Sequence, residues 1–468
     1  MPVDRTAVRD TAKYLRQIRP IDPAEVSEYV PDQPDPRVLR QLLREMALEL
    51  GIAEGPDGLF RPAATGPFRR PFDGVEGLPA AYDRELEALL VEQYGPDWHR
   101  GDSGAAIRER IERLKADYFA GRSVSYDWDL ALAYAIYHLA DYYASTQYLL
   151  AELSREGLVP SQARILDVGA GVGGPALAIA DFFDVSNREP DSLPVLDYQA
   201  VEPAAAADVL EALLGSGPRN VSVSIARETA EAFESSEPYD LIFFNNVLSE
   251  LENPVETADR YLDLLAPDGS LVLTAPADRN TSIQLREVER ELETRGATVY
   301  GPTVRLWPNE RPTEDCWSFD KQPDITVPGV QATLAEDANR AATVRNTSVK
   351  YSYSILRTDG ERRYDLALSR SNVAMLGEME THVGSRIDLV VAKLSRNLAE
   401  DGHPLYKVSD GSESENHFAV LVNETELNQA LRRAGYGDLL SVTNVLALYN
   451  DDEGAYNLVV DEETIVDA

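Results

Sequence analysis

A glycine-rich turn after a short apolar segment constrains the fold of this chain more than any other feature. Ile165–Val168 has the β-branched and aliphatic residues of a buried parallel strand. Gly169, Gly171 and Gly173 follow it directly and let the backbone turn sharply and approach a ligand. Pro175 then suits the first turn of a helix. Strand, turn and helix together predict a loop that holds a nucleotide cofactor.

Two classes of cofactor fit this loop. Gly169, Gly171 and Gly174 match the G-x-G-x-x-G pattern of dinucleotide-binding enzymes. Asp167 favours the other class, because a carboxylate there attracts the amino group of a methionine moiety and repels a pyrophosphate at the helix N-terminus. The D-x-G-x-G-x-G arrangement resembles the first motif of class I S-adenosylmethionine (SAM) methyltransferases. The resemblance implies a Rossmann-like α/β sheet that binds SAM, with Ala170 in the loop as a further contact.

Four more strand-like segments follow the loop and predict a doubly wound parallel sheet, in which ligands bind at the carboxyl ends of strands. Glu202 follows the first of them, where an acid accepts hydrogen bonds from both ribose hydroxyls. Its separation from Asp167 exceeds the usual ~20 residues, and a polar insertion at 187–194 accounts for the excess. The segments are Leu196–Val201, Val221–Ala226, Tyr239–Phe244 and Leu265–Leu273.

The loops after the later strands complete the predicted cofactor site. Glu228 follows the segment Val221–Ala226, where the adenine edge is expected, and Asn245 follows Tyr239–Phe244. The full set of predicted SAM-binding residues is Asp167, Gly169, Ala170, Gly171, Gly173, Glu202, Glu228 and Asn245.

The composition is strongly acidic. Asp and Glu number 80 against 44 Lys and Arg, for a net charge of −36. Such a surface, with very few lysines, is similar to that of halophilic proteins, whose charge repulsion is screened within ~3 Å at 1 M salt. Acidic disordered tails fit less well, because the charge is spread along the chain and 44% of residues are hydrophobic. In a halophile, negative charge does not exclude a nucleic-acid partner.

Sequence features predict a cytoplasmic protein with no membrane association. No apolar stretch approaches the ~18 residues of a transmembrane helix, and the N-terminus lacks the apolar core of a signal peptide. Cys316 is the only cysteine, which excludes an internal disulfide framework and fits a reducing compartment.

We predict three domains: an N-terminal helical region (1–155), a SAM-binding domain (156–370) and an OB-like domain (380–468). In the first, the aromatic-rich segment Tyr134–Tyr148 is expected to pack against the sheet, with His138 as a packed residue. A tyrosine-lined surface for a substrate or RNA is the alternative. Helices are predicted over Asp35–Leu50, Ala106–Phe119 and Leu130–Leu153.

The C-terminal part has the element order of an OB-fold, a small β-barrel that often binds single-stranded nucleic acid. Three strands are followed by a helix and two strands. They are expected at Arg386–Leu394, His403–Val408, His417–Val422, Asn423–Ala434 (the helix), Leu440–Tyr449 and Ala455–Val460.

Some residues of this barrel are candidates for contact with nucleic acid. Tyr406 and Phe418 are positioned to stack bases, and a place in the barrel core or rim is an equal alternative. The three histidines, His382, His403 and His417, lack the close spacing of a zinc site. The basic candidates are Arg386, Lys393, Arg396, Lys407, Arg432 and Arg433.

The segment between the two folds narrows the family. Val304–Phe319, with its Cys-Trp-Ser-Phe end, and Asn346–Leu356 resemble methyltransferase-like assembly factors of the mitochondrial small ribosomal subunit and their prokaryotic relatives. The resemblance covers residues from about 130 to the end. It implies the small ribosomal subunit or its rRNA as the partner, with the oligomeric state left open.

One departure from that family concerns metal. Relatives often have cysteines here that ligate an iron-sulfur cluster. Trp307 and Arg311 stand at two of those positions and only Cys316 remains. A single thiolate cannot hold a four-cysteine cluster, so we expect no iron-sulfur cluster and no metal.

The predicted function is SAM-dependent methyl transfer to, or in association with, small-subunit rRNA. The chain lacks the Asn/Asp-Pro-Pro-aromatic motif of base amino methylation after Asn245, and Cys316 lies outside the cofactor motifs, which disfavours covalent attack on pyrimidines. Alignment of the reactants suffices for this chemistry, so no catalytic residue is assigned. The alternatives are a non-catalytic assembly factor that retains a SAM pocket and a small-molecule methyltransferase.

Overall fold

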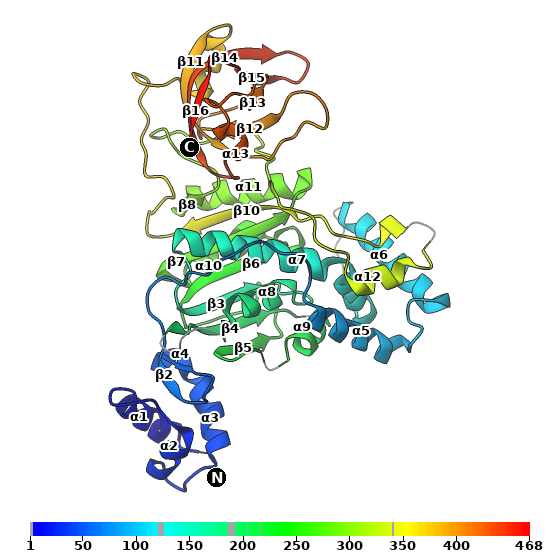
Figure 1. Cartoon of the computed structure of the whole chain (residues 1–468), viewed down its shortest axis with the longest axis vertical. Coiled ribbons are helices and arrows are strands. Elements are labelled where there is room, and N and C mark those ends of the chain that lie inside the picture. The colour runs from blue at the N-terminus through cyan, green and yellow to red at the C-terminus, as the bar shows by residue number, and fades with distance from the viewer. Residues whose placement is uncertain (1–2, 120–125, 186–191, 204, 216, 339–340) are drawn as a thin grey trace. The chain divides into compact units, whose positions relative to one another are not determined.

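The computed structural model describes residues 3–119, 126–185, 192–203, 205–215, 217–338 and 341–468 (Figure 1). The chain divides into two compact units, and these cut across the three predicted segments, which remain a sequence-based description. The first unit comprises Met1–Asn245, Leu264–Gly269 and Pro323–Val349, and the second Asn246–Asp263, Ser270–Gln322 and Lys350–Ala468.

The first unit begins with short helices around a small core. The side chains of Asp4, Asp22 and Asp35 accept backbone N–H groups at the starts of the first three helices. The single helix predicted over 35–50 is wrong, because the backbone leaves the helical region at Met46 and so turns the next residues into the same core. The elements are α1 (Arg5–Leu15), α2 (Pro23–Tyr29), α3 (Pro36–Glu45), α4 (Ala47–Leu50) and a hairpin of β1 (Ile52–Glu54) and β2 (Phe60–Pro62).

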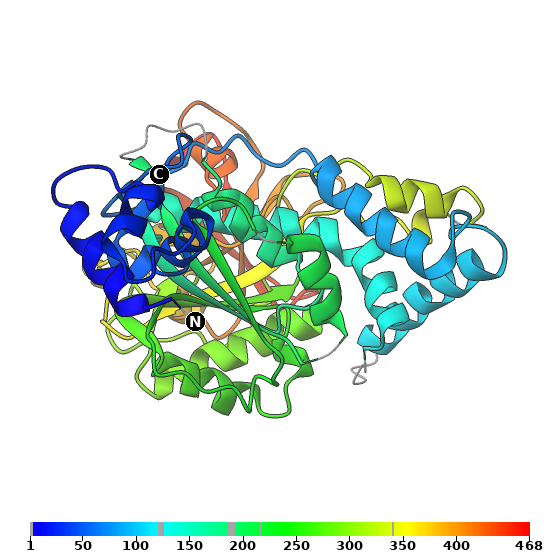
Figure 2. The same ribbon diagram turned by 90° about the horizontal axis from the view of Figure 1, so that it is seen from below.

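Three longer helices follow, namely α5 (Ala80–Tyr94), α6 (Gly101–Phe119) and α7 (Trp128–Glu156). The aromatic-rich helix was expected to pack against the sheet, but the main contacts of α7 are with α8, the helix after the glycine turn, while α5 and α6 lie beside α7 (Figure 2). None of the helices in the described ranges is long and apolar enough to cross a membrane.

The predicted Rossmann-like sheet is confirmed. Its strands pair in the order β5-β4-β3-β6-β7-β10-β8, and β9 pairs with β10. The first four are mutually parallel, and β10 is antiparallel to β7 and β8. The strands are β3 (Gln162–Val168), β4 (Val195–Val201), β5 (Val221–Ala226), β6 (Tyr239–Asn245), β7 (Leu265–Pro276), β8 (Thr298–Gly301), β9 (Asp320–Lys321) and β10 (Lys350–Arg357).

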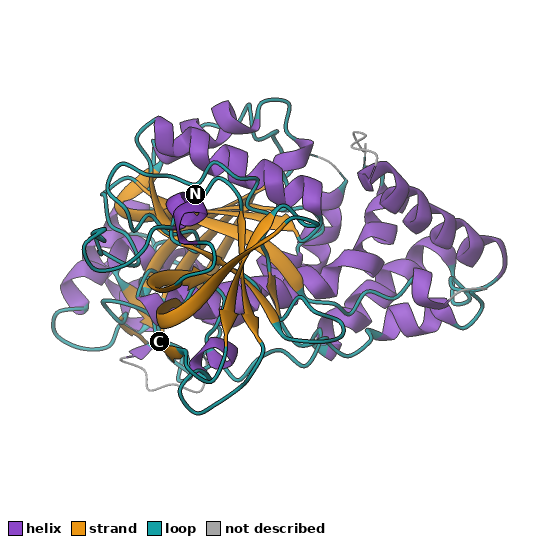
Figure 3. Ribbon diagram, turned by 90° about the horizontal axis from the view of Figure 1, so that it is seen from above, coloured by secondary structure: helices purple, strands orange, loops and turns teal. Residues whose placement is uncertain are grey.

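Helices connect these strands, and Figure 3 distinguishes the helices, in purple, from the strands, in orange. Residues 187–191 of the predicted insertion lie outside the described residues. The helices are α8 (Gly174–Phe183), α9 (Ala206–Leu214), α10 (Pro254–Leu262), α11 (Arg279–Thr294) and α12 (Gly329–Ala335).

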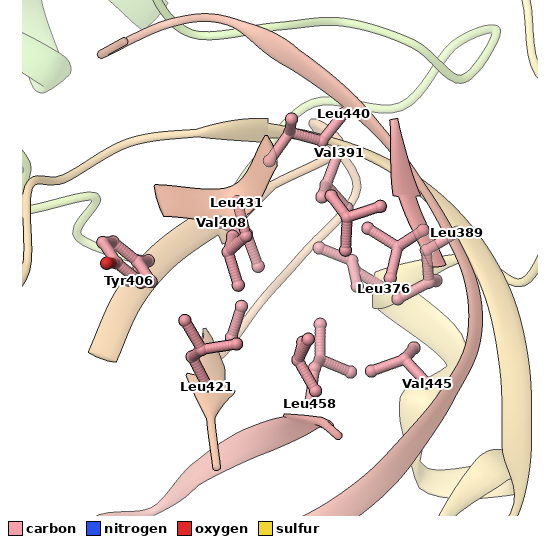
Figure 4. Packing of buried hydrophobic residues seen from close by; sticks show 14 of the residues in the cluster. Leu376, Leu389, Val391, Tyr406, Val408, Leu421, Leu431, Leu440, Val445 and Leu458 are labelled. Atoms are coloured by element: carbon pink, nitrogen blue, oxygen red, sulfur yellow. The ribbon is translucent and has the colours of Figure 1, made fainter. Parts of the chain in front are cut away.

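The C-terminal part of the second unit is a closed five-stranded barrel with the OB order. Its strands pair as β11-β12-β13-β15-β14, β11 also pairs with β14 to close the barrel, and β13 and β15 are parallel. Leu389, Val391, Leu421 and Leu458 are among the side chains that fill it (Figure 4). The strands are β11 (Arg386–Lys393), β12 (Leu405–Ser409), β13 (Asn416–Leu421), β14 (Leu439–Asn450), β15 (Ala455–Val460) and an added β16 (Ile465–Asp467).

The barrel helix is much shorter than predicted. Of the predicted Asn423–Ala434, only α13 (Ala430–Arg433) is helical. Asn428 explains the loss, because its side chain bonds to backbone groups of Asn423, Thr425 and Asp461 and so competes with helical hydrogen bonds.

Candidate functional site

The glycine turn after β3 has the strained geometry that its sequence predicted. Gly169, Gly171 and Gly173 have φ of 70°, 55° and 97°, a region that side chains with a Cβ rarely adopt. The backbone N–H groups of Gly169 and Ala170 both donate to the carbonyl of Val201 at the end of β4, at 2.8 and 3.2 Å. A Cβ added at Gly171 would meet only the Gly169 oxygen, 4.0 Å away. The turn therefore stays open on that side, as a ligand cradle requires.

Asp167 lies beneath this turn, fully buried near the end of β3. Its Oδ2 accepts a hydrogen bond from the Tyr198 hydroxyl at 2.8 Å, and its Oδ1 accepts one from Asn245 Nδ2 at 3.1 Å. Burial raises the pKa of Asp167 to about 6, although these two hydrogen bonds act in the opposite direction. Because both oxygens are engaged, a ligand amino group would have to replace one of these partners.

Glu202 links the end of β4 to the turn. Its Oε2 accepts the backbone N–H of Gly171 at 2.9 Å, and the residue is only 8% exposed. This bond fixes the middle of the turn relative to the carboxylate that was predicted to hold the ribose. The carboxylate therefore lies at the position where a ligand over the glycines would meet it.

Glu228 is the predicted residue that is not brought into this cluster. It is exposed after β5 and forms no hydrogen bond or ion pair with the other predicted residues that the structure describes. Its neighbour Arg227 pairs with Asp208 and Glu211 of α9 at 2.7 and 2.8 Å. The described contacts thus unite Asp167, the glycine turn, Glu202 and Asn245, with Glu228 apart from them.

Sequence reasoning missed Tyr198. It occupies the middle of β4, is 1% exposed, and its hydroxyl is bound to Asp167. A tyrosine in a fully buried parallel strand requires a partner for its hydroxyl, and the only acid at the end of the neighbouring strand was available to supply it. That pairing is the feature from which Tyr198 was predictable.

The residues present fit SAM better than a dinucleotide. The open turn at Gly171 admits backbone approach, Glu202 supplies acceptors, and Asp167 places negative charge below the turn. A pyrophosphate at this turn would lie near two carboxylates, whereas a methionine amino group is positively charged. Asp167 would act mainly through Asn245 and Tyr198, which it orients.

A second cluster lies on α7, beside the turn. Tyr134, His138 and Tyr142 share one face of the helix, and the His138 ring stacks on Tyr142 with centroids 4.7 Å apart. A Cβ added at Gly174, the first residue of α8, would lie 3.0 Å from Tyr142 Cβ. The aromatic face of α7 therefore lies against the residue that directly follows the glycine turn.

Most of the barrel residues that were predicted to contact nucleic acid form contacts within the protein instead. Lys393 donates to the Ala434 carbonyl at 2.7 Å, and Lys407 contacts Glu314 at 3.0 Å with both side chains nearly inaccessible. Tyr406 is buried in the barrel core, the alternative to base stacking, with Lys393 over its ring. Phe418 on β13 is half-buried. Arg386, Arg396 and Arg432 pair with Asp461, Asp320 and Glu424, whereas Arg433 forms no ion pair with any other described residue.

The segment with the single cysteine is part of the packed interior of the second unit. Cys316 is 1% exposed, and burial raises the pKa of its thiol to about 11. Trp307 donates to Asp410 at 2.7 Å and Arg311 to Thr294 at 2.6 Å. Within the described ranges, no three His, Cys, Asp or Glu side chains are grouped as they would be around a metal ion.

Three family models match the sequence. Residues 138–325 match a methyltransferase domain. Residues 5–56 and 377–468 match the N-terminal and C-terminal domains of one family of unknown function, DUF8157. No protein with a curated description matches the sequence.

Several solved structures match part of the chain. A putative methyltransferase from Thermoplasma acidophilum is 15% identical, with 44% of this chain and 70% of that chain covered and a TM-score of 0.27. A TehB-like SAM-dependent methyltransferase from Corynebacterium glutamicum is 14% identical, with coverages of 54% and 98% and a TM-score of 0.28. The plantazolicin methyltransferase BpumL, in complex with SAH, is 14% identical, with coverages of 59% and 99% and a TM-score of 0.28. The glycine turn lies within residues 138–325, the segment that matches a methyltransferase domain.

Proposed function

We propose that this protein transfers a methyl group from SAM to small-subunit ribosomal RNA in the cytoplasm, during ribosome assembly or translation. The observation that carries the methyl-transfer part is the linked network of Asp167, Asn245, Glu202 and the open turn at Gly171. The barrel with OB order supports an RNA substrate, since that fold commonly binds oligonucleotides. The sequence resemblance to small-subunit assembly factors supports the choice of rRNA.

Each part of the network has a task in this proposal. When bound, SAM supplies an electrophilic methyl group. Glu202 holds the ribose hydroxyls, the backbone of Gly169 to Gly173 approaches the methionine part, and Asp167 fixes Asn245 so that its amide faces the ligand. Rigid positioning of this kind is the main contribution a protein makes to methyl transfer.

SAM binding is tested by isothermal titration calorimetry. Glu202→Ala and Asp167→Ala are expected to weaken binding by about 1–3 kcal/mol, the usual cost of losing a charge-assisted hydrogen bond. Glu87→Ala is the matched control, because that acid is exposed on α5 and is not one of the predicted SAM-binding residues. Equal affinities of the wild type and both variants would refute the site.

The substrate is tested by mass spectrometry of rRNA from a deletion strain. Loss of one methylated nucleotide, restored by the wild-type gene and not by the Glu202→Ala gene, is the expected result. Unchanged rRNA methylation with accumulated precursor subunits would instead establish a non-catalytic assembly factor.

One observation favours that alternative. Both oxygens of Asp167 have protein partners in the absence of a ligand, so the network also serves to hold β3, β4 and β6 together. A small-molecule acceptor is the third candidate, favoured by the internal roles of Lys393 and Lys407 in the barrel.

A further inference from the structure

The polar face of α7 carries a cluster of three side chains that has no role in the proposed SAM-binding network. Tyr134, His138 and Tyr142 follow one another at intervals of four residues, which places them in a row on the helix. The imidazole of His138 contacts both of the other rings, with centroid distances of 4.9 Å to Tyr134 and 4.7 Å to Tyr142, and the two tyrosine centroids lie 6.2 Å apart. Tyr142 stacks on the imidazole and Tyr137 meets it edge-on at 4.8 Å, so the neighbouring rings hold it in place, with its two nitrogens on the ring edge.

One nitrogen of that edge is already fixed. Nδ1 of His138 lies 3.3 Å from Oδ2 of Asp141, one helical turn away. With the proton on Nδ1, this bond leaves the lone pair on Nε2, the arrangement that orients a histidine as a general base. Within the described part of the chain, Nε2 makes no hydrogen bond, while 26% of the side chain stays exposed.

The carboxylate of Asp141 is only partly hydrogen-bonded. Its second oxygen, Oδ1, is buried and has no hydrogen-bond partner. Native proteins rarely leave such an oxygen unsatisfied unless it has a role outside packing. A histidine placed only for packing would not need this carboxylate, so the pair is better explained by function than by stability.

The side-chain cluster on α7 lies beside the glycine turn. Gly174 begins α8 directly after Gly173, and a Cβ added there would meet the Leu139 oxygen at 3.0 Å, the Tyr142 Cβ at 3.0 Å and the Tyr143 nitrogen at 3.3 Å. Only glycine permits this approach of α7. His138 is thus one helical turn from the residue that touches the end of the cradle.

We propose that His138 is the general base that deprotonates the methyl acceptor, that Asp141 positions it, and that the acceptor is the ring N–H of guanine or uracil. This inference rests on the proposed function and names the chemical class of its substrate. A base is needed only where the acceptor nitrogen bears a proton, and the ring nitrogens of adenine and cytosine already have a free lone pair.

The acceptor nitrogen forms a bond to the methyl carbon while the carbon–sulfur bond of the sulfonium breaks, and the sulfur keeps that electron pair. The proton of the ring N–H passes to Nε2 of His138. The imidazolium so formed is stabilised by the carboxylate of Asp141 and then loses its proton to water.

The neighbouring helix is less acidic than the chain as a whole. In α6, four Lys and Arg stand against four Asp and Glu, whereas the whole chain has 44 against 80. This helix packs beside α7, and Lys115 lies over the ring of Tyr137 at 3.9 Å. A nucleotide therefore meets less repulsion here than the average surface of this protein would give.

Nitrogen NMR of the full-length protein tests the acceptor class without requiring turnover. The chain has 5 histidines, so ¹⁵N-histidine labelling gives few resonances, and His138→Gln assigns the relevant one. In protein saturated with S-adenosylhomocysteine, GMP or UMP is expected to shift the His138 resonance, while AMP and CMP leave it in place. No shift with any nucleotide, or equal shifts with all four, would overturn the proposal.

Turnover tests the role of the base. Transfer of radiolabelled methyl groups to small-subunit rRNA from a deletion strain is expected to fall about 10²–10⁴-fold in His138→Ala, with SAM affinity unchanged. Added imidazole is expected to restore part of the rate, which it would not do for a packing residue. His382→Ala is the matched control and keeps the wild-type rate.

The two hypotheses fail in distinguishable ways. Equal rates in wild type and His138→Ala overturn the inference and leave the proposed function standing. A wild-type protein that methylates no RNA, yet shows the GMP or UMP shift, overturns the rRNA substrate and supports the nucleobase site. Asp141→Asn separates positioning from binding, because a lower kcat with an unchanged KM for RNA is expected.

Discussion

The buried charge of Asp167 is expected to destabilise the protein at neutral pH. Burial raises the pKa of this carboxyl from 3.8 to about 6. An acid whose pKa is raised by folding contributes its full stability below pH 3.8, and that contribution is lost as the pH rises through about 6. At 1.36 kcal/mol per pH unit between these two values, the loss is about 3 kcal/mol at pH 7. No screening correction applies, since the side chain is 0% exposed.

Asp167→Asn removes this charge at almost constant size. The amide oxygen still accepts from Asn245, and the amide nitrogen donates to the hydroxyl oxygen of Tyr198. In urea unfolding at fixed KCl, we expect the variant to be more stable than the wild type by about 2 kcal/mol at pH 5 and about 3 kcal/mol at pH 7 and above. The same variant is expected to bind SAM about 10- to 100-fold more weakly.

The comparison between the two proteins isolates one group. Other carboxyls with raised pKa values in the first unit, such as Asp181 and Asp240, titrate in both proteins and cancel. Glu228→Gln, at an exposed position, should give no pH-dependent difference. A stability difference for Asp167→Asn that does not grow between pH 5 and pH 7 would refute the reasoning.

Three further predictions follow from the described contacts. Gly173→Ala is expected to cost about 1–2 kcal/mol more than Gly171→Ala in urea unfolding, because both have positive φ but only Gly173 would place a Cβ 3.2 Å from Leu210. Lys407→Met is expected to cost about 3–5 kcal/mol by leaving Glu314 buried without its partner, and a cost below about 1 kcal/mol would contradict this. Raising KCl from about 0.2 to 3 M is expected to raise the melting temperature, because screening shortens to ~3 Å near 1 M and the net charge is −36; a constant melting temperature would contradict a halophilic surface.

The sheet and the cofactor turn were predictable because their determinants are local. Val221–Ala226 and Ala455–Val460 were predicted with the bounds that the structure gives them, since β-branched residues and flanking turn residues define a strand within a few positions. Gly169 and Gly173 were predictable because no other residue adopts positive φ as readily. The OB order followed from the number and order of elements alone.

The rest depends on partners far away in the sequence. The sequence pattern identifies Lys407 only as a polar residue on a strand. Its burial depends on the contact with Glu314, which lies 93 positions earlier in the sequence. The helix after β13 looked regular, yet Asn428 bonds across to Asp461 on the other side of the barrel. Such contacts exist only once the fold is formed, so no local pattern contains them.

The covered face of the barrel sets a condition on any RNA contact. OB-folds bind oligonucleotides with the face of their second and third strands, here β12 and β13. In this chain Leu306 and Thr313 donate backbone hydrogen bonds to Asp410 and Glu413, in the loop joining these strands, at 3.2 and 3.0 Å. Glu314, the buried partner of Lys407, belongs to the segment 304–316. An RNA that displaced this segment would break that ion pair, at a cost of about 3–5 kcal/mol. RNA that binds outside this face avoids that cost. We therefore expect the surface that receives the base to lie on α7, beside the cofactor turn.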